Sequence, residues 1–323
     1  MNQMKPAMNG NFARTRFGAM GLLLPAVLAL TLVACGKPGA QAGFATPGAA
    51  FDALVAALEK NDLVAANQLL GPEAGDLLVS GDAVQDQADR ADFVALYKAG
   101  HSLQEDGADR SILVTGENDW QFPIPAVRKD GKWTLDGAAG ADELVYRRVG
   151  GNEIGAIAVM RGFVEAQNEY ADQGHDGDPA GIYALKLVSD AGLQNGLYWP
   201  TEGDEPPSPA GEFVAAAAGE GYSAPQGAPS YHGYHYRMLY KQAATAKGGE
   251  REYFKDGLLT QGFALVAWPA DYGASGVMTF VVSQDGDVFQ KDLGEDTAAT
   301  VQQMMAFDPD SSWTLVPVTA PAG

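Results

Sequence analysis

The chain of 323 residues contains a single cysteine, Cys35. One cysteine cannot form a disulfide within the chain, and it cannot supply a zinc site built from several thiolates. The fold must therefore be stabilised by its hydrophobic core, without covalent cross-links. About 280 residues follow the amino-terminal segment, a length that suffices for one large domain or two ordinary ones.

The residues before the cysteine have the order of a secretory signal. Lys5, Arg14 and Arg16 precede an apolar run at 17–33 that is interrupted only by small residues and one proline. A basic start followed by a short apolar core is typical of exported proteins. The alternative is an uncut membrane anchor, for which the run is at the short end.

The sequence LVAC, which ends at Cys35, resembles a bacterial lipobox. The resemblance implies diacylglycerol on Cys35, cleavage after Ala34 and acylation of the new amino terminus. We therefore expect a signal peptide at 1–34, a tether at 35–45 and attachment to a membrane through acyl chains. Gly36 stands where aspartate would be a retention signal, and by resemblance to sorted Gram-negative lipoproteins this implies the periplasmic face of the outer membrane.

The net charge restricts the possible partners. The whole chain carries −20, and removal of the three basic residues in the leader, which has no acidic residue, leaves −23. Nucleic-acid binding depends on Lys and Arg that neutralise phosphates, so we expect no nucleic-acid partner. The body should also be repelled by anionic lipids, which leaves the anchoring to the acyl chains. Solubility is the simplest explanation of the charge itself.

Residues 46–150 are expected to form an amino-terminal α+β domain. Thr46-Pro47 predicts a helix start, because a capping hydroxyl is followed by proline at the first helical position. A second short helix is expected at 63–70, and a third one around Phe93.

A curled antiparallel sheet should follow these helices, with strands at 112–114, 122–127 and 133–135. Asp130-Gly131 predicts a hairpin between the last two strands, because this pair suits the positive φ angles of a tight turn. Two prolines in the segment 122–127 cannot donate ladder hydrogen bonds, so we expect this strand at an edge.

Residues 151–323 are expected to form a carboxy-terminal domain in which one helix packs on an antiparallel β-meander. Asn152 is predicted to cap that helix, with Ile154, Ile157, Ala158 and Val164 on its apolar face. Strands are expected at 263–268, 277–282 and 288–290, with a hairpin at Asp285-Gly286. A late helix is expected at 297–307. The fold class is therefore α+β.

The segment YHGYHYRMLYKQ admits three interpretations: a metal site, an aromatic binding face or a strand. From Gly233 onward the residues alternate, with tyrosines on one side, which favours a strand with a tyrosine core face. His232 and His235 are three apart, so on a strand they face opposite sides and cannot easily share an ion. We therefore expect no metal site here.

Other polar clusters are also interpreted as structural. The run DQGHDGDP at 172–179 departs from a calcium loop and is expected to be a solvated turn. Glu202, Asp204 and Glu205 are expected to be a mobile acidic loop rather than a glycosidase pair. GASG, which contains Ser275, lacks the spacing of a nucleophile elbow. No catalytic, cofactor-binding or metal-binding residue is expected, and no cofactor.

Together, the motifs DWQFPIPAVRKDGKWTLDGAAG, GNEIGAI, GLYWP, YHGYHYRMLYKQ and FALVAWPADYGASGVMTF resemble an exported bacterial lipoprotein family of the domain of unknown function 2950 type. No activity is established for that family, so the resemblance assigns no catalytic residue. The helix at 152–172 and the later meander are similar to the head of type IV pilin-like proteins, without the long membrane helix. The amino half is similar to nuclear-transport-factor-like domains, a fold that often holds a pocket.

Two functions follow as hypotheses. The first is a non-enzymatic envelope lipoprotein that binds or scaffolds another periplasmic or outer-membrane component, an envelope protein or a glycan. The second is an enzyme or small-ligand carrier that uses a pocket in the amino half and acts on cell-wall or surface glycans. A deep cleft with convergent polar groups favours the second, and a flat body with an exposed apolar patch favours the first.

Overall fold

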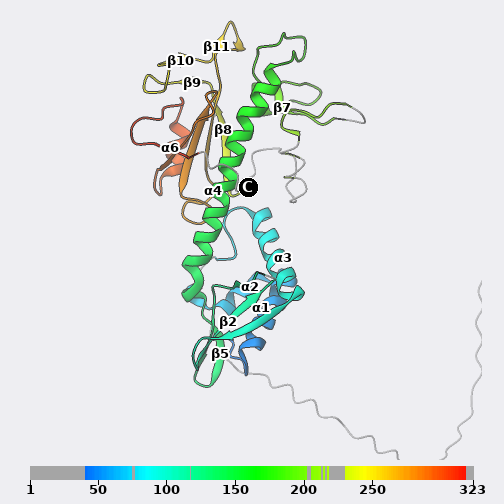
Figure 1. Cartoon of the computed structure of the whole chain (residues 1–323), viewed down its shortest axis with the longest axis vertical. Coiled ribbons are helices and arrows are strands. Elements are labelled where there is room, and N and C mark those ends of the chain that lie inside the picture. Colours follow the sequence, from blue (N-terminus) through cyan, green and yellow to red (C-terminus); the bar gives the residue numbers. More distant parts are fainter. Residues whose placement is uncertain are drawn as a thin grey trace, which may run out of the picture. The chain divides into compact units, whose positions relative to one another are not determined.

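A computed structural model describes residues 41–74, 77–116, 118–201, 205–211, 214, 217 and 230–317 (Figure 1). The expected signal peptide, the lipidation site Cys35 and the start of the tether lie outside these residues. The chain divides into two compact units, 1–40 and 41–323, and only the second contains described residues. Gln41 already belongs to the fold, because its side-chain amide donates hydrogen bonds to the carbonyls of Leu69 and Leu135.

Three capped helices open the second unit. The helical segments are α1 (Pro47–Glu59), α2 (Leu63–Leu70), η1 (Pro72–Ala74, a 3-10 turn) and α3 (Ala83–Ala99). The predicted helix start is confirmed, since the Thr46 hydroxyl accepts a hydrogen bond from the Ala49 N–H. Asp62 and Asp82 cap α2 and α3 in the same way, which satisfies amide groups that have no partner inside the helix.

An antiparallel sheet follows these helices. Its strands are β1 (His101–Glu105), β2 (Arg110–Thr115), β3 (Trp120–Gln121), β4 (Ala126–Lys129) and β5 (Lys132–Leu135). The order is β1-β2-β4-β5, with β3 paired to β2. The hairpin between β4 and β5 is confirmed: Asp130 and Gly131 have φ angles of 53° and 76°, as a tight turn of this kind requires.

The strand expected at 122–127 is interrupted, and its predicted edge position is wrong. Only β4 pairs regularly, and it lies between β2 and β5. Pro123 and Pro125 fall in the segment between β3 and β4, where no ladder hydrogen bond is required of them. The prolines therefore end the pairing instead of moving the strand to the edge.

The helix α4 (Gly137–Ala171) is 35 residues long and passes through the expected domain boundary at residue 150. The prediction that Asn152 caps a new helix is wrong. Asn152 is buried inside α4, and its side-chain Nδ2 donates a hydrogen bond of 2.9 Å to the carbonyl of Ser275. Gly150, Gly151 and a capping-type residue indicate a helix stop by local preference. Tertiary packing on both sides of this point overrides that preference.

The buried face of α4 is also displaced from the predicted one. Ile154 is 72 % exposed, whereas Ala156, Met160 and Phe163 lie in the core. Val164 is buried as predicted. Because successive helical positions turn by about 100°, Phe163 lies on the opposite side of α4 from Ile154. Ile157 is partly buried against the same core, and Ala158 is exposed.

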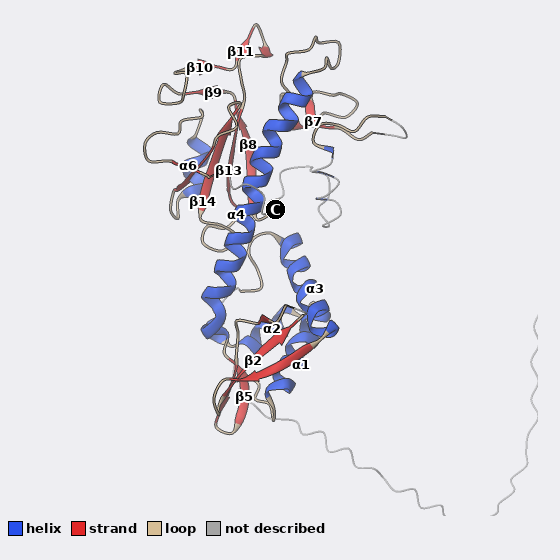
Figure 2. Cartoon of the chain, viewed as in Figure 1, coloured by secondary structure: helices blue, strands red, loops and turns tan. Residues whose placement is uncertain are grey.

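A second antiparallel sheet packs against the carboxy-terminal part of α4 (Figure 2). Its strands are β8 (Tyr234–Leu239), β13 (Ala264–Pro269), β14 (Met278–Ser283), β15 (Val288–Asp292) and β16 (Thr314–Leu315), neighbours in this order. The helix α6 (Thr297–Gln303) packs against β13. The predicted helix-plus-meander arrangement and the α+β class are confirmed.

Short strand pairs complete the described fold. They are β6 (Lys186–Val188) with β7 (Gly196–Tyr198), β9 (Lys241–Gln242) with β10 (Arg251–Glu252), and β11 (Phe254–Lys255) with β12 (Leu258–Leu259). None of the helices among the described residues has the length and apolar character needed to cross a membrane.

The strand predicted from YHGYHYRMLYKQ is β8. Tyr234 is completely buried, Tyr236 is half-buried with its hydroxyl on the carbonyl of Tyr231, and Tyr240 is 38 % exposed. The tyrosine face is therefore core at its start and opens toward its end. On the other face, Arg237 donates to the last carbonyls of α6.

The described residues have two hydrophobic cores. The first lies among α1, α2, α3 and the first sheet, and the second lies among α4, the second sheet and α6. The amino-terminal turns of α4 pack against the first core, through Ala141, Leu144 and Val145. The division into domains at 46–150 and 151–323 stays a prediction.

We predict that Gly150→Ala and Gly151→Ala stabilise the protein. No atom lies within 4 Å of a Cβ added at either position, so each change should raise the free energy of unfolding by up to about 1 kcal/mol through helix propensity. Gly140→Ala is the control, a change at a glycine of α4 that has no room for a side chain, because its Cβ would lie 2.6 Å from the Pro123 backbone. Urea denaturation measures all three. Destabilisation by the first two changes would show that α4 is not a continuous helix here.

Candidate functional site

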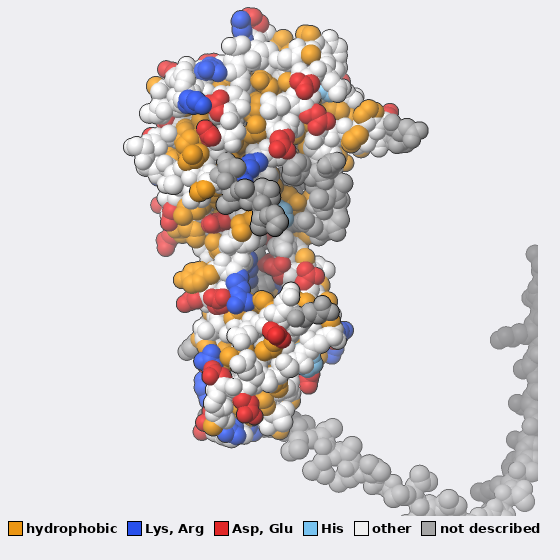
Figure 3. Space-filling view, in the orientation of Figure 1, with side chains coloured by type: hydrophobic (Ala, Val, Ile, Leu, Met, Phe, Trp, Pro, Cys, Tyr) orange, Lys and Arg blue, Asp and Glu red, His pale blue; other side chains and the backbone are white. Residues whose placement is uncertain are grey.

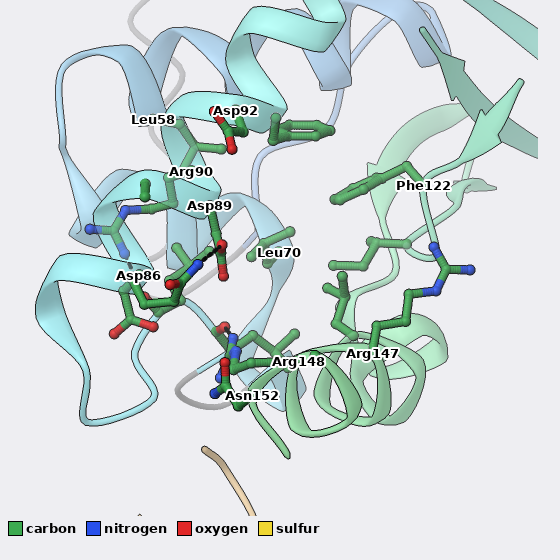
Figure 4. Close-up of a pocket in the computed structure, with 18 of the residues that line it drawn as sticks. Leu58, Leu70, Asp86, Asp89, Arg90, Asp92, Phe122, Arg147, Arg148 and Asn152 are labelled. Carbon is green, nitrogen blue, oxygen red and sulfur yellow. Dashed lines mark hydrogen bonds between the residues drawn. The ribbon is translucent and has the colours of Figure 1, made fainter. Parts of the chain in front are cut away.

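A cleft of about 850 Å³ lies among α1, α2, α3 and the amino-terminal half of α4 (Figure 4). Its lining combines segments that are far apart in the sequence, from α1 to the turn that precedes β8. The volume falls in the range of small-molecule sites, roughly 300–1,000 Å³. This cleft is the candidate functional site.

The floor of the cleft is apolar. It is made of buried side chains from α1, α2 and the segment between β3 and β4: Leu54, Leu58, Leu70, Phe122 and Ile124. Phe93 from α3 stacks on Phe122 with ring centroids 4.7 Å apart, and Trp120 lies beside both rings. This aromatic group joins α3 to the sheet and gives the floor a fixed shape.

One wall of the cleft is acidic. Asp86, Asp89 and Asp92 follow one another at three-residue spacing, which places them along one side of α3. Asp86 is buried and accepts hydrogen bonds from the backbone and the hydroxyl of Ser80, so its role is structural. Asp89 accepts a 2.7 Å hydrogen bond from Gln85. Asp89 and Asp92 are therefore the carboxylates that face the cleft. Arg90 lies between them on α3 and also lines the cleft, where it donates a 2.7 Å hydrogen bond to the Leu78 carbonyl.

The surroundings of Asp89 disfavour its charged form. Asp89 is exposed at the surface, but partial desolvation of its carboxyl raises the pKa of Asp89, and the neighbouring Asp86 and Asp92 raise it further. The hydrogen bond from Gln85 and the charge of Arg148 lower the pKa of Asp89, but they do not offset the desolvation.

The other wall is basic. Arg147 of α4 lies 5.3 Å above the ring of Trp120, bonds Glu143 on its own helix at 2.7 Å and reaches the carbonyl of Gln121 at 3.4 Å. Arg148 is half-buried and donates a hydrogen bond to the carbonyl of Leu77. In Figure 4 Arg147 lies across the cleft from Asp89 and Asp92. Cation–π stacking and hydrogen bonds hold the Arg147 guanidinium in place.

Two buried hydrogen bonds close the end of the cleft nearest the second core. The carboxylate of Asp82 caps α3 and also accepts a 3.0 Å hydrogen bond from the Gly233 N–H. Asn152 donates to the Ser275 carbonyl. Gly233 has a φ of 69°, and a Cβ there would lie 2.4 Å from Asn152 Nδ2. Glycine is therefore required at this close approach.

The two histidines of the tyrosine-rich segment lie in different places. His232 lies in the turn before β8, with a φ of 50°, packs over Gly155 and lines the cleft. His235 lies in β8 beside Trp268, and burial lowers the pKa of its imidazole. Among the described residues, no three His, Cys, Asp or Glu side chains gather as a metal site would require. The sequence argument had placed both histidines on the strand, and for His232 that was wrong.

The polar run at 172–179 anchors the end of α4. His175 stacks on Tyr170 and bonds its carbonyl, and Asp176 accepts a hydrogen bond from the backbone of Gln194. Tyr170 donates to the Gln194 carbonyl at 2.5 Å. These contacts connect the last turn of α4 to the loop before β7.

The remaining clusters do not converge on the cleft. Ser275 is buried, and its hydroxyl bonds the backbone of Asp271 in a tight turn, as expected for a residue that is not an activated nucleophile. Glu202 and Asp204 lie outside the described residues. Glu205 does not line the cleft.

The cleft residues were not identified from the sequence. The repeat Asp86, Asp89, Asp92 and the pair Arg147-Arg148 were visible as spacings, but each occurs on an ordinary amphipathic helix. Only the fold brings α3 and α4 to opposite sides of one apolar floor.

A family model described as "Protein of unknown function (DUF2950)" matches residues 41–316. This match confirms the predicted family, while export and lipidation stay predictions. No curated protein matches the chain, and no solved structure does. The likeness to pilin heads therefore stays a prediction.

We predict that Asp89→Asn changes the pH dependence of stability. The pKa of Asp89 is raised above its usual 3.8 in the folded protein. The stability that the protonated Asp89 carboxyl contributes is therefore complete at low pH and is lost as the pH rises through the folded pKa. The variant should therefore be more stable than the parent at pH 7, with the difference vanishing below about pH 3. Urea titrations across this range measure it. A difference that is constant with pH would contradict the account.

Proposed function

Since the chain belongs to the DUF2950 family, whose function is unknown, its role must be inferred from its own geometry, and we propose that it is a non-enzymatic envelope lipoprotein that binds a small envelope component in the cleft. This proposal keeps the non-enzymatic lipoprotein of the first hypothesis and takes the small-ligand pocket from the second, which a cleft favours. The single observation that carries the proposal is the cleft itself, with an apolar floor between an acidic and a basic wall. A concave apolar site with a few oriented polar groups is the usual form of a binding site.

The chemistry of the lining favours binding over catalysis. The described residues that line the cleft include no hydroxyl, thiol or amine side chain to act as a nucleophile. Arg147 and Arg148 are held by hydrogen bonds and stacking, which suits them to orient a ligand.

One observation favours the alternative, an enzyme that hydrolyses glycans. A raised carboxyl pKa, as at Asp89, is what a general acid requires. Trp120 offers an aromatic surface at the same site. Release of sugar from cell-wall or surface glycans by the parent, and its loss in Asp89→Asn, would support this alternative.

The proposed location rests on the amino-terminal sequence. A basic leader and an apolar core directly precede Cys35, the single cysteine of the chain. The acidic body offers little attraction to anionic lipids. Acidic and basic side chains are interspersed on the face drawn in Figure 3. Attachment by acyl chains at Cys35 to the periplasmic face of the outer membrane is therefore part of the proposal.

We predict that the uncharged fluorophore N-phenyl-1-naphthylamine binds the cleft at a single site. Ala88→Trp should abolish the fluorescence increase, because Ala88 is half-buried in the cleft lining and a bulky ring there fills the space. Ala95→Trp is the matched control, an exposed alanine of α3 that does not line the cleft. Absence of binding to the parent, or equal binding to both variants, would contradict the proposed function.

We predict that Cys35 carries the lipid. Metabolic labelling with an alkyne fatty acid should mark the parent, and Cys35→Ser should remove the label. A variant that starts at Gly36 behind a non-lipid secretory leader carries no acyl chain. It should therefore be found in the soluble periplasmic fraction, because attachment to the membrane requires acyl chains. An unlabelled parent, or a Gly36 variant that still sediments with membranes, would show that the proposed location is wrong.

A further inference from the structure

The two walls of the cleft carry opposite charges, and among the described residues no ion pair joins Arg147 to the aspartates of α3. Asp89 and Asp92 lie on α3, and Arg147 of α4 lies across the cleft from them (Figure 4). Arg148 interacts electrostatically with Asp89 itself, so the charge that opposes the aspartates is that of Arg147. The ion pair of Arg147 is made with Glu143, one turn earlier on its own helix. The cleft therefore has an electric field directed from one wall to the other.

Such a field selects for ligands that are themselves dipolar. An anion is attracted by the arginine wall and repelled by the aspartate wall, and for a cation the attraction and repulsion are exchanged. A ligand with a positive group at one end and a negative group at the other gains at both walls.

The charged groups retain capacity for a ligand. A carboxylate has about four acceptor positions, and the hydrogen bond from Gln85 occupies one on Asp89. A guanidinium has five N–H donors. Arg147 directs Nε to Glu143 and Nη1 to the Gln121 carbonyl, and Arg148 directs Nη2 to the Leu77 carbonyl. Among the described residues Arg147 makes no other hydrogen bond, so its second terminal nitrogen can donate to a carboxylate.

We propose that the cleft binds a short apolar peptide with free termini, its ammonium group at Asp89 and Asp92 and its carboxylate at Arg147. This inference rests on the proposed binding function and specifies its ligand class. Apolar peptide side chains would cover the leucines of the floor, and the two termini would match the two walls. Exposure of Asp89, Asp92 and Arg147 leaves both ends of the site accessible.

Displacement of bound N-phenyl-1-naphthylamine by leucyl-leucine tests the proposal on the full-length protein. The free dipeptide should displace the fluorophore at about fivefold lower concentration than its N-acetyl or its C-amide form, since each capped form loses one partly exposed ion pair.

Neutralising one wall at a time should reverse the selectivity. Asp89→Asn with Asp92→Asn should make the N-acetyl form at least as effective as the free dipeptide. Arg147→Gln should make the C-amide form at least as effective as the free dipeptide. Arg147 alone is changed because it is exposed, whereas Arg148 is half-buried and bonded to Leu77, so its loss can impair folding. Unchanged binding of the fluorophore shows that each variant keeps its cleft.

Each outcome has one meaning. Crossed selectivity in the two variants supports the proposal. Equal displacement by all three dipeptides, or a parent that prefers a capped form, overturns the dipolar ligand but leaves the binding cleft intact. Failure of the fluorophore to bind the parent refutes the proposed function itself, and with it this inference.

Discussion

The described structure depends on one continuous helix that contributes to both hydrophobic cores. At its start, α4 approaches the first core so closely that a Cβ on Gly137 would lie 2.5 Å from the Leu70 carbonyl oxygen. Farther along, Met160 and Phe163 are buried under the second sheet. Because a helix transmits its direction over its whole length, the position of Arg147 and Arg148 is determined by packing at both ends. The basic wall of the cleft is thus a consequence of this arrangement.

A small buried polar group joins the cores beside the cleft. Asp82, Asn152, Gly233 and Ser275 come from four distant parts of the chain and exchange direct hydrogen bonds. Buried polar groups are costly unless paired, so each member favours the arrangement in which the others are satisfied. The Gly233–Asp82 bond holds the His232 turn at the start of α3, and the Asn152–Ser275 bond holds the Ser275 turn against α4. Asn152 and His232 both line the end of the cleft.

Local chemistry allowed much of the fold to be predicted from the sequence. The Thr46 cap, the Asp130-Gly131 turn and the strand β8 follow from a few adjacent residues, and all three were confirmed. The burial in β8 does not alternate as expected, since Met238 and Leu239 are both buried. The errors arose where distant contacts decide. Asn152 was taken for a cap because its partner, Ser275, is more than a hundred residues away. The cleft was missed for the same reason, since neither Asp89 nor Arg147 indicates a site until α3 and α4 face each other.

The central claim is that the charged walls and the apolar floor act together as one binding site. Nuclear magnetic resonance of nitrogen-labelled protein tests it most directly, through the indole N–H of Trp120 and the Nε–H of Arg147, both at the cleft. Addition of a free apolar dipeptide should shift both signals, while the indole signals of Trp268 and Trp313 in the second core remain unchanged. Shifts at Trp268 or Trp313 without a shift at Trp120 would contradict the account.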